Sequence, residues 1–299
     1  MNNKGSILCA AILALTIIVP ASAAAVDQKV QADPHGTVEV NNAAGRIRCI
    51  GWEKPEIQIT GELGGSDRLD VQRQGATTTI RVLSRLGISV YNEAELEIKI
   101  PAASSLRVSA VSADVEVSGV SGDQRLQSVS GDVQTEAAKA DVTLKSISGN
   151  VKVRGKREAL HTIVSTVSGS SSVIDVGGEL EFGTVSGDSI IDMSSLTRAR
   201  LKTISGDVKM TAKLAPEARV DASSVSGDLQ LRWLGVESSN IELESFSGEI
   251  DSCFGGVPVQ HPTYGPGSSW RYGPKDAPKD VKGDIHVKSM SGDIHLCNR

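Results

Sequence analysis

Short runs in which apolar and polar residues alternate follow one another along most of the chain. Such runs lie, for example, at residues 140–144, 180–182 and 241–243. Alternation with a period of two is typical of a strand with one buried face. No stretch of helical length repeats its apolar residues every 3.6 positions or so, and the pattern therefore predicts an all-β protein.

A four-residue motif separates these runs. An apolar residue is followed by Ser, by Gly and by Asp, with small variations at the third and fourth positions. Nine copies follow one another at a nearly constant period, starting at residues 111, 129, 147, 167, 185, 204, 225, 246 and 290. Their serines lie 18 to 21 residues apart, except for a final gap of 44 residues. This period predicts a parallel β-solenoid, a β-helix-like fold in which each unit supplies two short strands.

Stacking would satisfy the backbone of these units and bury their apolar side chains. Successive units would lie about 4.8 Å apart, with Val, Ile and Leu aligned inside. Simple alternation predicts that Val129 and Val133 share one face and that Ser130 and Asp132 share the other. Gly131 would either adopt a positive φ or fit a tight corner.

The first 23 residues have the order of a secretory signal peptide. Lys4 precedes an apolar run from Ile7 to Val19, and Pro20 and three small residues follow. The run is shorter than the roughly 20 residues that span a bilayer, and the order is typical of a cleaved signal. We therefore expect an exported protein, periplasmic or associated with the cell surface; a membrane anchor is the alternative. We expect no transmembrane segment in the mature chain, because no second long apolar segment follows.

The remainder divides into two regions. Residues 24–104 lack the motif but still alternate, with Asn, Gly and Pro between the runs. We expect them to form an N-terminal β cap, or sub-domain, that covers strand edges and apolar interior at one end of the stack. The solenoid would occupy residues 105–299, with an insertion rich in aromatic residues, Pro and Gly at 254–283.

Composition narrows the range of partners. Aromatic residues make up only 3% of the 299 residues, whereas glycine occurs 30 times, which suits thin stacked layers. The net charge is −5, and loss of the signal peptide removes one Lys and gives −6. Because the chain also lacks a basic tract, nucleic acid and anionic lipid are not expected partners.

Three features together carry a family resemblance. They are Gly45-Arg46-Ile47 leading to Gly51-Trp52, the segment Ile98-Lys99-Ile100-Pro101-Ala102, and the Ser-Gly-Asp array that follows. In these features residues 35–297 resemble the bacterial "putative adhesin" family, a domain-of-unknown-function family of cell-envelope β-repeat proteins. The resemblance implies a β-helix-like fold and an extracytoplasmic location, and it supplies no catalytic residues.

Two cysteines have the same phase in their repeats. Cys253 and Cys297 each lie six residues after the serine of their motif. In adjacent units they would lie side by side, and because export permits oxidation we expect a Cys253–Cys297 disulfide that pins the last unit. The alternatives are two reduced, buried thiols, or a zinc site with Asp251 and His295, which also share a phase. Cys49 is expected to be a buried, small apolar residue.

In register, the motif stacks Asp188, Asp207 and Asp228 one unit apart. We expect these carboxylates, like the motif serines, to bond turn N–H groups of neighbouring units. The alternative is a Ca²⁺ ladder of the β-roll kind, for which these three residues are weak metal candidates. Asn150 and Ser170 interrupt the column, and no cofactor is expected.

The insertion at 254–283 gathers four of the nine aromatic residues. Long loops are often functional, and exposed rings suit contact with a glycan or a protein. Our candidate binding residues are therefore Phe254, Tyr264, Trp270 and Tyr272. The alternative is that the loop folds back as a C-terminal cap, with its rings packed on the stack.

Common signatures of catalysis are absent from the sequence, which has no Gly-x-Ser-x-Gly elbow, no His-Glu-x-x-His and no phosphate loop. We expect a non-enzymatic cell-envelope protein, an adhesin-like surface or scaffold for an unknown protein or glycan. One alternative is a carbohydrate-active β-helix enzyme, a lyase or hydrolase, which would need a groove holding acids that break the phase of the repeat. Another is a Ca²⁺-binding β-roll.

Overall fold

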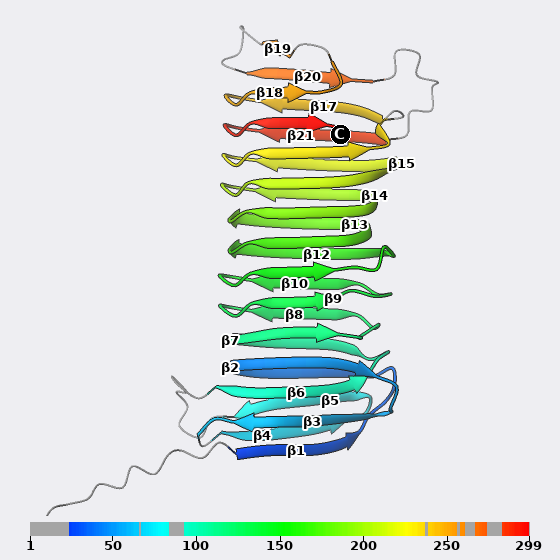
Figure 1. The fold of residues 1–299 in the computed structure, drawn as a ribbon, viewed down its shortest axis with the longest axis vertical. Coiled ribbons are helices and arrows are strands. Elements are labelled where there is room, and N and C mark those ends of the chain that lie inside the picture. The colour runs from blue at the N-terminus through cyan, green and yellow to red at the C-terminus, as the bar shows by residue number, and fades with distance from the viewer. Residues whose placement is uncertain are drawn as a thin grey trace, which may run out of the picture.

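The computed structural model describes residues 24–65, 67–83, 93–236, 239–255, 258–260, 267–273 and 283–298. The extended elements in these residues are β-strands, and the all-β prediction is confirmed. Figure 1 shows the strands stacked one above another along the long axis of the molecule. The described residues contain no helix of the length and apolarity needed to cross a membrane. The predicted signal peptide, residues 1–23, lies outside the described residues.

The N-terminal strands form a mixed sheet at one end of the stack. They are β1 (Ala24–Gln31), β2 (Thr37–Trp52), β3 (Glu56–Leu63), β4 (Arg68–Gln74), β5 (Thr77–Leu83) and β6 (Ala94–Pro101). The pairs β1–β3, β3–β6 and β4–β5 are antiparallel. By contrast, β2 is parallel to β5 and β6 on one side and to β7 on the other. The long strand β2 therefore joins this end to the repeat region.

The repeat region follows in chain order up to β16. Its strands are β7 (Ser105–Ser118), β8 (Gln124–Ser128), β9 (Val133–Glu136), β10 (Val142–Ser146), β11 (Val151–Arg154), β12 (Ala159–Ser168), β13 (Ser171–Ser186), β14 (Ser189–Thr203), β15 (Val208–Ser224) and β16 (Leu229–Leu234). Neighbouring strands pair in parallel, and Val142 lies opposite Gln124 on one side and Thr162 on the other. The offsets equal the sequence period, so each repeat forms one rung with a strand before its motif and a strand after it.

The last strands do not stack in chain order. They are β17 (Ser239–Ser245), β18 (Ile250–Ser252), β19 (Val259–Gln260), β20 (Ser268–Tyr272), β21 (Gly283–Ser289) and β22 (Ile294–Cys297). Strand β21 lies between β15 and β17, and β22 lies between β16 and β18. The C-terminal rung, red in Figure 1, is thus inserted inside the stack. Beyond it, β20 pairs antiparallel with β17 and β19.

Small and branched side chains fill the narrow space between the strands of each rung. One column passes from rung to rung through directly opposed, buried residues: Leu126, Leu144, Val164, Phe182, Leu201, Ala222, Val287, Leu243 and Trp270. Most of these side chains are aliphatic, although two inner rungs hold a buried ring, Phe182 in this column and Trp233 on β16, and Trp270 lies on the terminal strand β20. The scarcity of aromatic residues suits this geometry, because aliphatic side chains fill most layers of the narrow interior.

The prediction that Val129 shares a face with Val133 is wrong. Val133 is 1% exposed and Val129 is 41% exposed. The buried residue at the corner is Ser128, whose Oγ accepts a hydrogen bond from the Gly131 N–H at 3.0 Å. The chain reverses between Ser128 and Val133, so the alternation of one strand does not continue into the next.

Glycine at the third motif position permits the close approach of successive turns. A Cβ at Gly131 would lie 2.0 Å from the Ala113 carbonyl oxygen, and one at Gly149 would lie 2.1 Å from the Gly131 carbonyl oxygen. No real Cβ contact is that short, so any side chain would force neighbouring rungs apart. Of the two roles predicted for this glycine, the tight corner applies at these positions.

A substitution pair tests this constraint. Gly149→Ala should destabilise the protein by about 1–3 kcal/mol, since the new methyl group overlaps the backbone of the previous rung. Gly183→Ala is the matched control, because a Cβ there has no atom within 4 Å. Thermal unfolding followed by circular dichroism should show a lower midpoint for Gly149→Ala and an unchanged or slightly higher one for Gly183→Ala. Equal midpoints for the two variants would contradict the argument.

Candidate functional site

The nine motif turns line up along one side of the stack, which we call the turn edge; it lies at the left in Figure 1. Each turn is bonded to the turn of the neighbouring rung. The Ser130 N–H donates to the Val111 carbonyl at 2.8 Å, and the Ser148 N–H donates to the Val129 carbonyl at 2.9 Å. The serine hydroxyls reinforce the same contacts, as Ser130 Oγ donates to the Val111 oxygen at 3.3 Å. The polar groups of the motif thus hold the rungs together.

The acidic residues of the motif also serve the backbone. Asp114 Oδ1 accepts the Asp132 N–H at 3.0 Å, and Asp207 Oδ1 accepts the Asp228 N–H at 2.9 Å. Asn150, which interrupts the acidic column, plays the same part toward Ser170 at 3.0 Å. These bonds follow the expectation that the side chains bond turn N–H groups. Within the described residues, the side chains whose ligand atoms lie close enough to share a metal ion are Cys253, His295 and Cys297 at the C-terminal rung, outside the acidic column.

The first residues of the nine motifs form an exposed apolar row, which we call the apolar ridge. Their exposed fractions range from 40% to 59%. In spatial order the apolar ridge comprises Val111, Val129, Ile147, Val167, Val185, Ile204, Val225, Met290 and Phe246. Met290 precedes Phe246 because the C-terminal rung is inserted between two earlier ones. At about 4.8 Å per rung, the ridge is about 38 Å long.

A further copy of the motif, Val120-Ser121-Gly122-Asp123, lies off the turn edge and was missed by counting at one period. Its valine is fully buried at 0% exposure. Ser121 bonds the Ala102 carbonyl through both its N–H and its hydroxyl. The same four-residue motif therefore has a buried valine here. The exposure of the first motif residue depends on its position at the turn edge and not on the motif itself.

The predicted cysteine pair lies where β18 and β22 end. Asp251 lies opposite His295 in the register of these strands, and a disulfide joins Cys253 to Cys297 with a Cα–Cα distance of 4.9 Å. His295 Nδ1 is 2.9 Å from Asp251 Oδ2, and its Nε2 is 3.4 Å from Cys297 Sγ. Cys49 is buried elsewhere, and burial raises the pKa of its thiol to about 12, so it is not a reactive thiolate.

The described aromatic residues of the insertion pack on the end of the stack. Trp270 is 3% exposed, and its indole N–H donates to the Gly255 carbonyl at 3.0 Å. Tyr272 stacks on Trp270 with ring centroids 6.0 Å apart, and Phe254 lies 5.4 Å from Tyr272. This arrangement corresponds to the capping alternative, and it leaves the buried Trp270 ring no surface for a ligand. Tyr264 lies outside the described residues, and a binding role for the half-buried Phe254 and Tyr272 stays a prediction.

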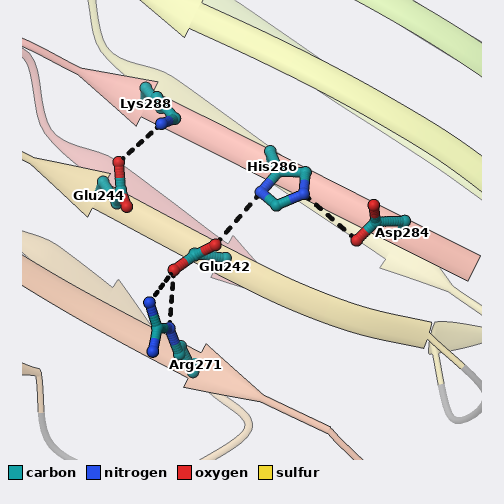
Figure 2. A network of polar contacts seen from close by, with 6 residues as sticks. All are labelled: Glu242, Glu244, Arg271, Asp284, His286 and Lys288. Carbon is teal, nitrogen blue, oxygen red and sulfur yellow. Dashed lines mark hydrogen bonds and ion pairs between the residues drawn. The ribbon is translucent and has the colours of Figure 1, made fainter.

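Opposite charges join the strands near this end on their outer face (Figure 2). Arg271 on β20 donates from Nε to Glu242 on β17 at 2.7 Å, and His286 on β21 lies 3.3 Å from the same carboxylate. Lys288 on β21 lies 2.9 Å from Glu244 on β17. The hydrogen bond from Arg271 lowers the pKa of Glu242, and the Glu244 carboxylate raises the pKa of Lys288. The network therefore ties β20 and the inserted β21 to β17.

A hollow of about 500 Å³ on the face formed by β12–β15 was not foreseen from the sequence. Acids and arginines from adjacent strands line it: Glu179, Glu181, Asp221, Arg198, Arg200 and Arg219. Arg198 lies 3.6 Å from Glu179, so charges of opposite sign compensate one another within the hollow. The signal in the sequence is a run of charged residues at outward positions of three successive rungs.

A family model described as Toastrack DUF4097 matches residues 37–251. No curated protein matches the chain.

Three solved structures are similar over most of their length. A "putative adhesin" from Bacteroides fragilis is 11% identical, covers 93% of this chain and 99% of its own, and gives a TM-score of 0.42. A "putative lipid binding protein" from Parabacteroides distasonis is 12% identical, with coverages of 91% and 96% and a TM-score of 0.43. A "putative cell adhesion protein" from Clostridium sporogenes is 10% identical, with coverages of 92% and 100% and a TM-score of 0.21. Such identities and scores support no argument about the function of this chain.

The disulfide can be tested by intact mass. Alkylation of the folded mature protein without reductant should leave Cys253 and Cys297 unmodified, whereas reduction and unfolding should expose both, together with Cys49. Replacing the pair by serine should cost about 2–4 kcal/mol, because the bond closes a long loop. Two alkylatable thiols at positions 253 and 297 before reduction would contradict the bond.

The Glu242 contacts predict a pH dependence. Because the folded state lowers the pKa of Glu242, its contribution is complete above the ordinary carboxyl pKa and is lost as pH falls through the lowered value. Thermal midpoints of the wild type and Glu242→Gln should therefore differ most near about pH 7 and converge toward about pH 3. The difference should correspond to less than about 1 kcal/mol, since the pair is exposed. A gap between the wild type and Glu242→Gln that does not vary with pH would contradict the assignment.

Proposed function

Because the chain belongs to the Toastrack DUF4097 family, we propose that it is a non-enzymatic cell-envelope protein whose apolar ridge binds a protein partner. The family match confirms the resemblance seen in the sequence. The fold proposed with it is a β-solenoid that serves as a rigid support for the ridge. Export to the periplasm or cell surface is part of this proposal, and it is supported by the signal-like order of residues 1–23 and by the disulfide.

The apolar ridge is the observation that carries the proposal. Exposed apolar residues scattered singly need no explanation, but a contiguous row on a soluble protein marks an interaction surface. Here the row continues through nine successive rungs, with every member at least 40% exposed. The hydrogen bonds between turns fix the spacing and direction of these side chains before any partner arrives, so little ordering entropy is lost on binding.

The residues beside the ridge indicate the chemistry of the partner. The fourth motif positions run parallel to it and are acidic at Asp114, Asp132, Asp188, Asp207, Asp228, Asp293 and Glu249. The chain as a whole carries a net charge of −5. An anionic glycan or an anionic lipid surface would be repelled by this column. A protein surface that presents an apolar stripe flanked by Lys or Arg is complementary in both respects.

The enzyme alternative would place its chemistry in the hollow on the face of β12–β15. Glu179, Glu181 and Asp221 break the phase of the motif, as a glycosidase site would require. However, these acids are interleaved with arginines, and Glu179 is already paired with Arg198. Incubation with neutral and acidic polysaccharides should release no reducing or unsaturated ends; release that disappears in Glu181→Gln would establish the enzyme instead.

Ridge variants test the binding role directly. Val129, Ile147, Val167 and Val185 would be changed together to Thr, which keeps β-branching and replaces a methyl group of each Val, or the ethyl group of Ile147, by a hydroxyl. The probes are three immobilised synthetic peptides that alternate Val and Lys, Val and Glu, or Ser and Lys. We expect the wild type to bind the Val/Lys peptide at least tenfold more tightly than the other two. The fourfold variant should lose at least tenfold, since each lost apolar contact contributes on the order of 1 kcal/mol.

Two exposed apolar residues outside the ridge provide the matched control. Ile190 and Leu234 are 57% and 48% exposed, and the pair Ile190→Thr and Leu234→Thr should bind like the wild type. If the Ser/Lys peptide bound as tightly as the Val/Lys peptide, charge alone would account for binding. That result would contradict the role of the ridge. Failure of the Val/Lys peptide to bind, or a preference for glycans or for vesicles of anionic lipid, would contradict the proposed partner.

A further inference from the structure

We propose that Cys253, Cys297 and His295 form a binding site for Zn²⁺ when the disulfide is reduced, with Asp251 positioning the histidine. This inference is independent of the apolar ridge and of its partner. The three candidate ligands come from two adjacent strand ends, since Cys253 directly follows β18 and Cys297 ends β22. Their ligand atoms all lie within 4.8 Å of one another.

The distance between the imidazole and the nearer sulfur fits a shared metal. Cys297 Sγ lies 3.4 Å from His295 Nε2. With Zn–S bonds of about 2.3 Å and Zn–N bonds of about 2.0–2.1 Å, tetrahedral coordination places S and N about 3.6 Å apart. The imidazole is therefore already within a few tenths of an ångström of its place relative to Cys297. The second sulfur reaches its position when the disulfide opens and the Cys253 side chain rotates away from Cys297.

Asp251 supplies the contact that such a histidine requires. Its Oδ2 lies 2.9 Å from His295 Nδ1, so the carboxylate accepts a hydrogen bond from the Nδ1–H and leaves Nε2 directed at the sulfurs. Metal-binding histidines commonly donate their second N–H to a carboxylate in this way. The contact comes from the pairing of β18 with β22, in which Asp251 and His295 are direct partners. Asp251 is thus a positioning residue rather than a ligand.

The reaction balances with a dithiol reductant of the thioredoxin-like class. The dithiol transfers two electrons and two protons, the Cys253–Cys297 bond breaks, and the reductant becomes a disulfide. Zn²⁺ then displaces one proton from each thiol, and both protons leave to solvent. The product has two thiolates, one neutral imidazole and one dication, so it carries no net charge and leaves a fourth position for water.

The surroundings permit both steps. Cys253 and His295 are exposed, so a reductant and a hydrated cation can approach from solvent. A hollow of about 290 Å³ beside His295 is lined by Asp228, Glu249, Asp251 and Asp293, whose charge favours entry of a cation. Thiolate and imidazole ligands select zinc over the hard cations Ca²⁺ and Mg²⁺.

Metal binding by the full mature protein tests the inference. Oxidised protein and protein reduced with a phosphine would each be dialysed against Zn²⁺, and bound zinc measured by mass spectrometry of the element. We expect one zinc per reduced chain and none per oxidised chain. Substitution by Co²⁺ should give the thiolate charge-transfer absorption and the visible bands of a tetrahedral site. Circular dichroism of the reduced protein shows whether the strands remain in place.

Single substitutions test the role of each residue in zinc binding. His295→Ala should weaken zinc binding at least tenfold, and Asp251→Asn should weaken it about 10- to 100-fold, as loss of an orienting carboxylate does. His286→Ala is the matched control, because His286 occupies the near-identical segment Gly-Asp-Ile-His on β21 and should leave binding unchanged. The inference is overturned if reduced protein binds no zinc, if His295→Ala binds as the wild type does, or if oxidised protein binds equally well.

Discussion

Hydrogen bonds between successive motif turns are the interaction on which the rest of the structure depends. They hold neighbouring corners so close that a single Cβ at Gly149 would meet the Gly131 carbonyl oxygen. At several corners the preceding Ser or Thr is buried and its hydroxyl accepts the N–H of the motif glycine, as Ser128 does for Gly131, Ser146 for Gly149 and Thr203 for Gly206. The side chain of the apolar residue that follows therefore points to solvent. The ridge is thus a geometric result of the way the rungs are joined.

Much of the architecture could be predicted from the sequence, because strand alternation and a fixed period are local properties. Equal phase was enough to bring Cys253 and Cys297 together. The side taken by Val129 could not be read from alternation, since the chain reverses at the corner. Val120 is an example, because its copy of the same four-residue motif lies at another edge of the stack and the valine is completely buried. The hollow on β12–β15 could not be predicted, because its lining residues are outward-facing positions of three rungs. They come together only through the register in which the strands pair.

The molecule keeps its different chemistries in separate places. The polar atoms of the turn edge are used between rungs, and the apolar ridge is what this edge presents to solvent. Charged pairs lie on the outer face, where they join β17, β20 and β21. Within the part of the chain that the structure describes, sulfur, imidazole and carboxylate groups meet at the ends of β18 and β22. A substitution on the outer face therefore leaves distant turns in place, because in a fold built from nearest-neighbour contacts its effect is confined to adjacent rungs.

The inserted C-terminal rung has a consequence for the order in which the protein is completed. Ser291 bonds the Val225 carbonyl across 66 positions of sequence, and Ser247 bonds the Met290 carbonyl across 43. Strands β17 and β18 are synthesised before the rung that must separate them from β15 and β16. The final layers can assemble correctly only after the last residues have emerged, whereas the earlier rungs can add one by one. A chain truncated near its end would keep most of its sheet yet lose the rung that joins its two parts, so an intact last layer requires the whole chain.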